Sequence, residues 1–347
     1  MSAFRVGDLS RAAAIIVCCG SGGVGKTTTA AALAVEGAAA GRRACVVTID
    51  PAKRLADALG LESLSNVPGR VEGPWPGELW ALMLDTKSTF DDLVARHADT
   101  PEQAAAILDN RLYRNISGAL SGTQEYMAME KLYELSAEGG FDLVVVDTPP
   151  TRNALDFLDA PRRLTRFLEN RVFRLLMTPT KAYFRAVGLA TQTFLRTVSK
   201  TVGADVVADA VTFFQSFEGM EQGFRDRAAA VDELLRAPST TFVLVTSPRP
   251  DAVQEARFFA MKLADASISV DGLVVNRVHP TFGSSPVAQG LGVLTRNLTE
   301  LRALASADDH HLEGLAILVA PAPMCRVPFL DAEVHDLAGL DRVRAHL

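Results

Sequence analysis

Residues 20–27 read Gly-Ser-Gly-Gly-Val-Gly-Lys-Thr, a spacing that suits a nucleotide phosphate. They match Gly-x-x-x-x-Gly-Lys-Ser/Thr at every fixed position. Glycines let backbone N–H groups turn toward phosphate oxygens, and the helix that follows points its positive end at the anion. The lysine would supply a point charge and the threonine hydroxyl a ligand for Mg²⁺. We predict that the nucleotide contacts Gly20, Ser21, Gly22, Gly23, Val24, Gly25, Lys26, Thr27 and Thr28.

Two aspartates at the ends of apolar runs add to this site. Asp147 ends the run "LVVVD", where Mg²⁺ needs a carboxylate, and Asp50 ends "CVVTID", where a carboxylate could orient the attacking water. Both would lie at the carboxyl ends of parallel strands, where open α/β sheets bind ligands. The alternative for each alone is a helix N-cap. Lys26, Asp50 and Asp147 are therefore the predicted catalytic set.

The elements that must position these residues form an alternating pattern. Short Val/Ile/Leu-rich runs predict strands buried on both faces of a parallel sheet, with helices between them. The phosphate loop would join the first strand to a helix over 26–40, and further helices would lie near 88–97 and from about 101. The segment 62–77 is typical of a surface loop. We predict seven strands, at 13–20, 43–50, 79–85, 141–150, 240–248, 270–278 and 315–323.

We interpret the whole chain, 1–347, as one phosphate-loop, nucleotide-binding domain: a three-layer α/β sandwich with a mostly parallel sheet. The interval 151–239 holds no convincing strand and predicts a helical insertion in that domain. The formal net charge of −6 argues against a nucleic-acid partner. We expect a cytoplasmic protein, at most peripheral to the inner face of the membrane, because no signal-peptide pattern or run of about 18 apolar residues occurs.

Several stretches together resemble one known family. "GSGGVGKTTTAAALA", "TIDPAKRLADALG", "DTPPTRNALDFLDAP", "LVVNRV" and "RVPFLDAEV" occur in the order and spacing of the arsenite-pump and tail-anchored-protein-targeting ATPases. These belong to the SIMIBI class of phosphate-loop proteins. The resemblance covers about 13–340, and "SGTQEYMAMEKLYEL" is similar to bacterial, actinobacterial-looking members. It implies a dimeric switch driven by Mg²⁺ and ATP.

The resemblance also implies roles for single residues. Asp50 would be the water-activating carboxylate of the first switch, with Asp57 as its second acid near the metal. Asp147 would face Mg²⁺ in the second switch, so the implied metal set is Thr27, Asp50, Asp57 and Asp147. Asn276 would read the adenine with its amide donor and acceptor. A loop of Val327, Pro328 and Phe329 would close over that base.

Three departures from the family pattern limit what can be carried over. Ser21 stands where members typically have a lysine that reaches the partner's phosphates, so we expect slow hydrolysis as a homodimer, or a paralogous partner that retains the lysine. The zinc-binding Cys-x-x-Cys of eukaryotic members is missing, so no zinc is predicted. No cysteine lies in 46–324, which makes arsenite transport a poor interpretation. The four cysteines, Cys18, Cys19, Cys45 and Cys325, are expected to be reduced thiols.

Two further segments leave alternatives open. Residues 162–200 carry nine basic side chains against one acid, with apolar residues at helical spacing through 217. They are either core helices with solvated basic faces or a surface for an apolar helical client or an anionic membrane. Residues 308–311, Asp-Asp-His-His, are either a polar loop before the last predicted strand or a metal site.

The predicted function is a Mg²⁺-dependent ATPase that couples its nucleotide state to a helical partner surface. The rival hypothesis is a regulatory subunit that binds ATP, hydrolyses little and pairs with a paralogue. Ser21 favours the rival, whereas Asp50 and Asp147 favour the enzyme.

Overall fold

A computed structural model describes most of the chain, and its contacts group into two units. Unit 1 comprises Met1–Leu84, Leu132–Leu155 and Arg236–Leu347, and unit 2 comprises Asp85–Lys131 and Asp156–Leu235. The prediction of one domain with an insertion at 151–239 stays a prediction. The structure describes residues 4–50, 53–110, 123–149, 159–160, 162–163, 165–166, 169, 212–213, 215–216, 219–283 and 292–347.

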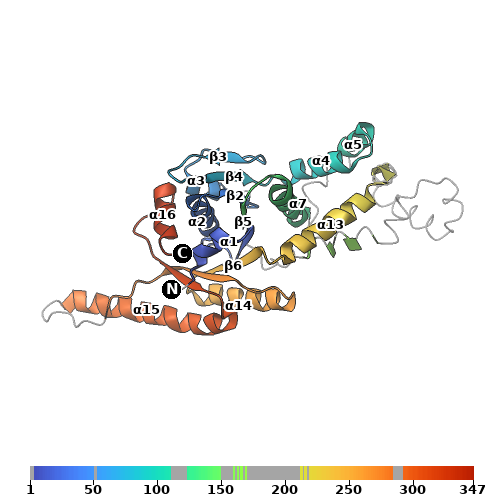
Figure 1. Ribbon diagram of the computed structural model, residues 1–347. Coiled ribbons are helices and arrows are strands. Elements are labelled where there is room, and N and C mark those ends of the chain that lie inside the picture. The colour runs from blue at the N-terminus through green and yellow to red at the C-terminus, as the bar shows by residue number, and fades with distance from the viewer. Residues whose placement is uncertain are drawn as a thin grey trace, which may run out of the picture. The chain divides into compact units, whose positions relative to one another are not determined.

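An eight-stranded sheet forms the centre of unit 1, in the order β3-β4-β2-β5-β1-β6-β7-β8 (Figure 1). Neighbouring strands are parallel except β3, which runs antiparallel to β4. Every residue of β1 and β5 is buried, as expected for central strands of a sheet covered on both faces. The strands are β1 (Ile15–Cys19), β2 (Arg43–Thr48), β3 (Gly69–Val71), β4 (Glu78–Met83), β5 (Leu143–Asp147), β6 (Thr240–Thr246), β7 (Gly272–Val278) and β8 (Met324–Pro328).

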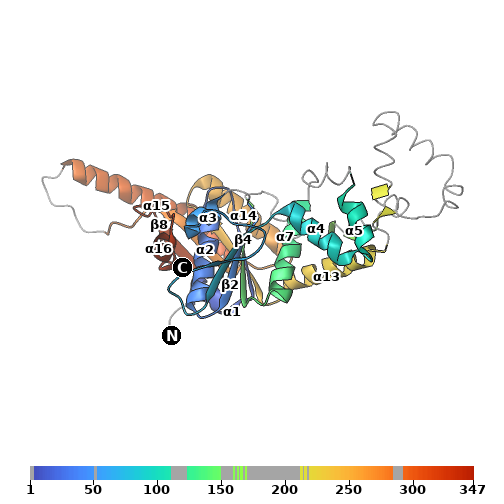
Figure 2. The ribbon, with the colours of Figure 1, turned by 90° about the horizontal axis from the view of Figure 1, so that it is seen from above.

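Helices cover both faces of this sheet. The crossover from β1 to β2 moves along the sheet in one direction and the crossover from β6 to β7 in the other. Because both are right-handed, their helices lie on opposite faces (Figures 1 and 2). One layer holds α2 (Lys26–Ala39), α3 (Arg54–Leu59) and α16 (Leu337–Arg344), and the other holds α14 (Pro250–Asp265) and α15 (Gly292–Val319). The predicted three-layer α/β fold is confirmed.

The register of the central strands brings the polar residues at their carboxyl ends to one edge of the sheet. Asp147, the last residue of β5, pairs with Cys18 on one side and Thr48 on the other. The phosphate loop leaves β1 directly after this row, and Asp50 follows β2 by two residues. Parallel strands therefore place the loop and both aspartates at the same edge. Short elements complete unit 1: η1 (Val6–Asp8), α1 (Leu9–Ala12) and a π-helical turn, η2 (Glu134–Glu138).

The sheet differs from the seven-strand prediction at its two ends. Six predicted strands are present, but 62–77 contains the short strand β3 in place of a plain loop. The predicted strand at 315–323 is wrong, because residues 315–319 are the last turns of α15. The actual edge strand is β8, five residues long, which follows them. Residues 308–311 also lie inside α15, so they form no loop.

Unit 2 is helical in its described part. It contains α4 (Thr86–His97) and α5 (Pro101–Leu108), and most of α7 (Thr123–Tyr133) and α13 (Glu221–Arg236), whose last residues belong to unit 1. Asp85 caps α4 by accepting from the Ser88 N–H, and Thr100 caps α5 through the Gln103 N–H. The predicted helices near 88–97 and from 101 are confirmed. Most of 162–217, the predicted partner surface, lies outside the described residues.

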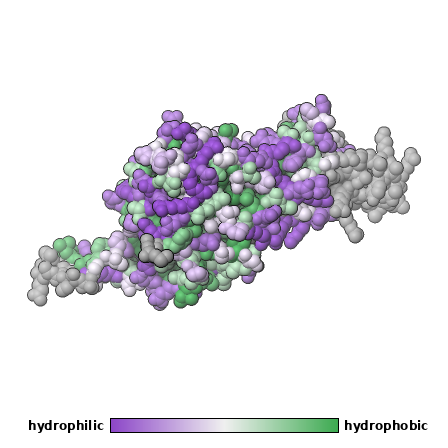
Figure 3. Space-filling model, viewed as in Figure 1, coloured by the Kyte–Doolittle hydropathy of each residue, from purple (hydrophilic) through white to green (hydrophobic). Residues whose placement is uncertain are grey.

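Apolar side chains are exposed on the outer helices of unit 1. Figure 3 shows apolar surface along the lower edge of the view, where Figure 1 places α14 and α15. These helices expose Phe258, Met261, Ile317 and Leu318. Across the described ranges, no helix combines the length and apolar character that crossing a membrane requires.

Candidate functional site

The phosphate loop requires glycine at two places where space is limiting. Gly20 has φ +151°, and a Cβ there would lie 2.1 Å from the Val245 carbonyl oxygen of neighbouring β6. Gly25 has φ +98° and directly precedes α2, and its Cβ would lie 2.1 Å from Nδ2 of Asn276. The sequence therefore folds this loop tightly between the ends of β6 and β7, with its backbone exposed to a ligand.

Lys26 lies almost fully buried at the start of α2. Its Nζ donates a hydrogen bond to the Ser21 carbonyl oxygen at 2.8 Å, so the side chain spans the loop. Burial lowers its pKa, and the nearby Asp147 carboxylate acts in the opposite direction. An ammonium that has lost water gains strongly from a phosphate oxygen. The arrangement can hold an anion above the loop.

Asp147 forms a small oxygen cluster with two threonines. Its Oδ2 accepts from the hydroxyls of Thr27 at 2.7 Å and of Thr48 at 2.9 Å. Its Oδ1 is buried and has no hydrogen-bond partner in the described part of the chain. Burial raises the pKa of this carboxyl group, although both hydroxyl bonds and Lys26 act against the rise. Oδ1 of Asp147, whose lone pairs are unused, and the adjacent Thr27 hydroxyl are the kind of oxygen ligands that a hard cation such as Mg²⁺ prefers.

A cavity of about 790 Å³ collects most predicted site residues. Its walls come from the phosphate loop, α3, the end of β7 and the segment that follows β8. This volume lies in the range of ordinary ligand sites. The predicted residues that line it are Gly23, Gly25, Lys26, Thr27, Thr28, Asp50, Asp57, Asn276, Pro328 and Phe329.

Six other predicted residues lie outside the walls of that cavity. Gly20 and Ser21 instead line a neighbouring cavity of about 330 Å³, together with residues of α14. Val24 is buried under the loop, and Val327 is 1% exposed inside β8, so Val327 is not part of a loop. Gly22 is exposed and lines neither cavity. Asp147 reaches the site through its bond to Thr27.

The side-chain amide of Asn276, expected to contact adenine, already makes two hydrogen bonds within the protein. Its Nδ2 donates to the Val24 carbonyl oxygen at 2.9 Å, and its Oδ1 accepts from the Arg277 N–H at 2.9 Å. One N–H and one lone pair of the amide remain for other partners. The contact with the phosphate loop was not predicted, since nothing in the sequence links residues 24 and 276.

The structure adds cavity residues that the sequence analysis missed. Arg54, the first residue of α3, has its Nη1 3.6 Å from Oδ2 of Asp50. Arg277 and His335 also line the cavity, as does Thr148, whose hydroxyl donates to the Cys18 carbonyl oxygen at 2.8 Å. Arg54 has a sequence signal, its i+4 spacing from Asp50. The other three have none.

Neither prediction for residues 308–311 fits the structure. The polar loop is wrong because the four residues lie inside α15, and three of their side chains contact separate partners. Asp308 accepts from the His279 N–H at 2.8 Å, His311 contacts the Pro248 carbonyl oxygen at 3.0 Å, and Asp309 pairs with Arg326. No group of three or more His, Cys, Asp or Glu side chains suited to a metal ion occurs among the described residues.

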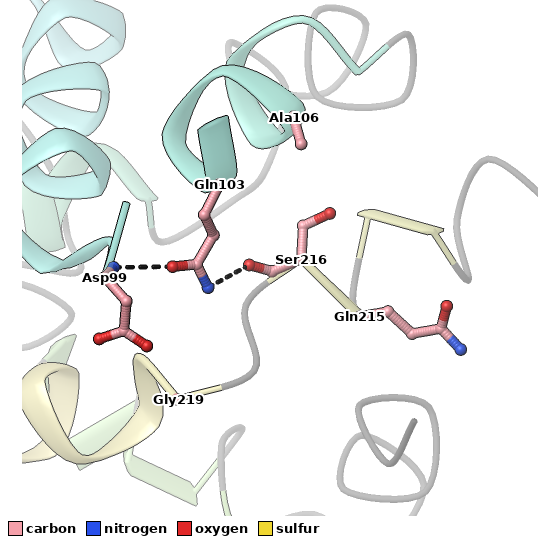
Figure 4. Close-up of a pocket in the computed structure, with 6 residues that line it drawn as sticks. All are labelled: Asp99, Gln103, Ala106, Gln215, Ser216 and Gly219. Atoms are coloured by element: carbon pink, nitrogen blue, oxygen red, sulfur yellow. Dashed lines mark hydrogen bonds between the residues drawn. The ribbon is translucent and has the colours of Figure 1, made fainter. Parts of the chain in front are cut away.

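Unit 2 contains a further cavity, of about 440 Å³ (Figure 4). The Gln103 side chain forms part of its wall, accepting from the Asp99 N–H at 2.7 Å and donating to the Ser216 carbonyl oxygen at 2.9 Å. These bonds engage both polar atoms of the Gln103 side chain within the wall. No predicted site residue lines this cavity, whose walls are formed by Asp99, Gln103, Ala106, Gln215, Ser216 and Gly219.

Comparison with known proteins gives a consistent result. Residues 13–347 match the family model described as anion-transporting ATPase. An uncharacterized protein of Streptomyces coelicolor is 31% identical over 296 residues, which are 82% of this chain and 70% of that protein. The ATPase GET3B of Arabidopsis thaliana is 27% identical over 308 residues, 83% of this chain and 69% of that protein. A putative arsenical pump-driving ATPase of Aquifex aeolicus is 25% identical over 227 residues, 65% of this chain but 50% of that protein.

Proposed function

The chain belongs to the anion-transporting ATPase family, and we propose that it is a Mg²⁺-dependent ATPase that works as a dimeric switch. The observation that carries the proposal is the cavity that joins the phosphate loop to Asp50, Asn276 and Phe329. Its lining combines the buried ammonium of Lys26 and the loop backbone with the Phe329 ring and the Asn276 amide. That combination suits a nucleoside triphosphate, with the phosphates on the loop and the base against the aromatic ring.

Each residue of the cavity would have a separate task. Lys26 and the loop N–H groups bind and orient the phosphates. Thr27 and the open Oδ1 of Asp147 would hold Mg²⁺, which when bound neutralises charge on the transferred phosphoryl group. Asp50 orients the attacking water and accepts its proton, and its ion pair with Arg54 holds the carboxylate at the cavity. Asp57 would contact the outer shell of the metal.

The base would lie against the end of β8 and the residue that follows it. Pro328, the last residue of β8, and Phe329 line the cavity there, and the centroid of the Phe329 ring lies 5.3 Å from that of the His279 ring. Asn276 has one N–H and one lone pair left for the edge of the base. We propose adenine as that base on the strength of the family.

The partners of the switch are proposed from the family and the sequence. ATP would close two copies of the chain, or this chain and a paralogue, and the segment 162–217 would offer an apolar, basic surface to a helical client or an anionic membrane. Arsenite transport is not part of the proposal, because no cysteine occurs in 46–324. Zinc and nucleic acid are not part of it either.

One observation favours a second candidate function. Ser21 lines the mouth of the loop with no charge of its own, where a lysine would add one. A chain of this kind could act as a weakly hydrolysing subunit that binds ATP and depends on a paralogue for turnover.

Calorimetry and a turnover assay test both candidates. Titrating the purified protein with ATP should give heat of binding with Mg²⁺ and less with EDTA, and single-turnover hydrolysis should follow. Binding without turnover until a lysine-bearing paralogue is added would favour the regulatory subunit. Absence of binding heat in monomeric and assembled samples would contradict both.

A further inference from the structure

The end of β7 is joined to the phosphate loop by one side chain. The Nδ2 of Asn276 donates to the carbonyl oxygen of Val24, a residue 252 positions earlier in the chain. In a trans peptide the C=O and the following N–H point in opposite directions. Fixing the Val24 carbonyl toward Asn276 therefore also fixes the direction of the Gly25 N–H, which belongs to the phosphate-binding loop.

Gly25 makes room for this contact. A Cβ at this position would lie 2.1 Å from Nδ2 and 3.3 Å from Cγ of Asn276. Its left-handed φ of +98° also suits glycine. The close approach shows that the amide packs directly on the loop backbone, and does not merely lie beside the cavity.

A backbone irregularity aims the amide at the loop. The pairing of β7 with β8 shifts between Asn276 and Val278, so Arg277 is the extra residue of a bulge. Arg277 has φ +60°, in the left-handed region that L-residues rarely adopt. In this conformation its N–H donates to Oδ1 of Asn276. The orientation of the amide is thereby set, with oxygen toward Arg277 and nitrogen toward Val24.

We propose that Asn276 is a positioning residue for the phosphate loop, held in place by the bulge at Arg277. This inference rests on the proposed nucleotide binding. It extends the expected contact with adenine, because the amide acts on the triphosphate through the loop whether or not a base is present. Removing the donor frees the Val24–Gly25 peptide and weakens binding of any triphosphate by a similar factor.

Two variants and three ligands test this role. Asn276→Ala removes the whole amide, and Asn276→Asp keeps the volume and the acceptor for Arg277 but replaces the donor with an oxygen. Dissociation constants for Mg²⁺ complexes of ATP, GTP and inorganic tripolyphosphate are measured by calorimetry or competition. We expect all three to weaken about tenfold in both variants, which corresponds to about 1.4 kcal/mol. Asn297→Ala, on the exposed start of α15, is the matched control.

The outcomes separate positioning from base recognition and from folding. Losses of similar size for all three ligands, with the melting temperature of Asn276→Asp unchanged, support the inference. An unchanged tripolyphosphate constant in both variants overturns it and leaves Asn276 as a reader of adenine. Affinity losses fully explained by the fraction of unfolded variant also overturn it. So does a wild type that binds ATP but not tripolyphosphate. A wild type that binds none of the ligands counts against the proposed function itself.

Discussion

Each unit of the molecule buries a pair of opposite charges, and the two pairs are built differently. In unit 1, Lys26 and Asp147 are 6% and 1% exposed; Lys26 lines the large cavity, and Asp147 bonds to Thr27, which also lines it. In unit 2, Arg227 Nε lies 3.1 Å from Glu130 Oε1, with side chains 9% and 3% exposed. The degree of burial is similar, so burial alone does not mark a site.

The Arg227–Glu130 pair of unit 2 is surrounded by other buried side chains. Burial and the Glu130 charge raise the pKa of Tyr126, and burial and the Arg227 charge lower the pKa of His97. The Tyr126 hydroxyl and His97 Nε2 are buried without a hydrogen-bond partner in the described residues. These groups lie among core side chains such as Phe224, whose ring is 5.4 Å from His97. The two pairs therefore differ in what surrounds them: the pair of unit 1 adjoins a cavity of ligand size, whereas the pair of unit 2 lies among core side chains.

The largest expected effect comes from removing the charge that faces space. Lys26→Met should lower single-turnover ATP hydrolysis by about 10³-fold or more, because the methionine stem fills the same volume without a charge for the phosphates. Rapid-quench measurements of phosphate release would check this. Lys53→Met, on an exposed position just before α3, is the matched control. A loss below tenfold would contradict the role of Lys26.

The charged pair of unit 2 should affect stability instead. Arg227→Met leaves Glu130 without its buried counter-charge and should lower the free energy of unfolding by about 3 kcal/mol. The double variant Arg227→Met/Glu130→Leu should recover most of that loss, because no unpaired charge remains. Denaturant unfolding followed by circular dichroism measures both. If the single variant lost ATP affinity at full stability, the contrast between the units would be wrong.

The same contrast explains what could be predicted from the sequence. The phosphate loop, Asp50 and Asp147 were found because fixed spacings in a strand–loop–helix context carry their own geometry. The contacts of Asn276 with Val24 and of Thr48 with Asp147 were not, because they join distant segments through the register of the sheet. Local patterns indicate which residues end strands, whereas the register decides which of those residues touch.

The C-terminal part shows a failure of periodicity. The run "LAILVA" after residue 314 resembles a strand because it is short and apolar. In α15, however, Leu315 and Val319 are buried while Ile317 is 78% exposed, which is a helical pattern. The buried stripe runs back in steps of three and four through a polar stretch, which obscures it in the sequence. Its members are Ala305, Asp308, Leu312, Leu315 and Val319.

Asp147→Asn tests whether the open oxygen of unit 1 serves a cation. We expect Mg²⁺-dependent ATP affinity to fall about 100-fold, since an amide is a poorer ligand than a carboxylate. Calorimetry with and without Mg²⁺ would measure the loss. Glu62→Gln removes an exposed carboxylate elsewhere in unit 1 and is the control.

Although Asp147→Asn should weaken ATP binding, it should stabilise the nucleotide-free fold near neutral pH. Burial raises the pKa of Asp147 above its ordinary value of 3.8, so the folded protein keeps this proton to higher pH than the unfolded chain. The wild type therefore loses stability as pH rises from 3.8 through the raised pKa, and the asparagine variant lacks this part of the slope. Thermal unfolding without nucleotide between about pH 4 and pH 7 shows the difference. Parallel curves for both proteins would contradict a raised pKa.

Ser21→Lys should produce the smallest change. This variant tests whether hydrolysis is slow because residue 21 carries no positive charge. Ser21 lines the cavity that α14 shares with the loop, where the acidic side chains of Asp251 and Glu255 would favour an added ammonium. If a dimer forms and only the lysine is missing, single-turnover hydrolysis should rise at least about tenfold, a small part of what such a charge supplies in trans. Ser21→Met matches the length without the charge and should give no gain. Equal rates for all three proteins would mean that slow turnover, if observed, arises elsewhere than at residue 21.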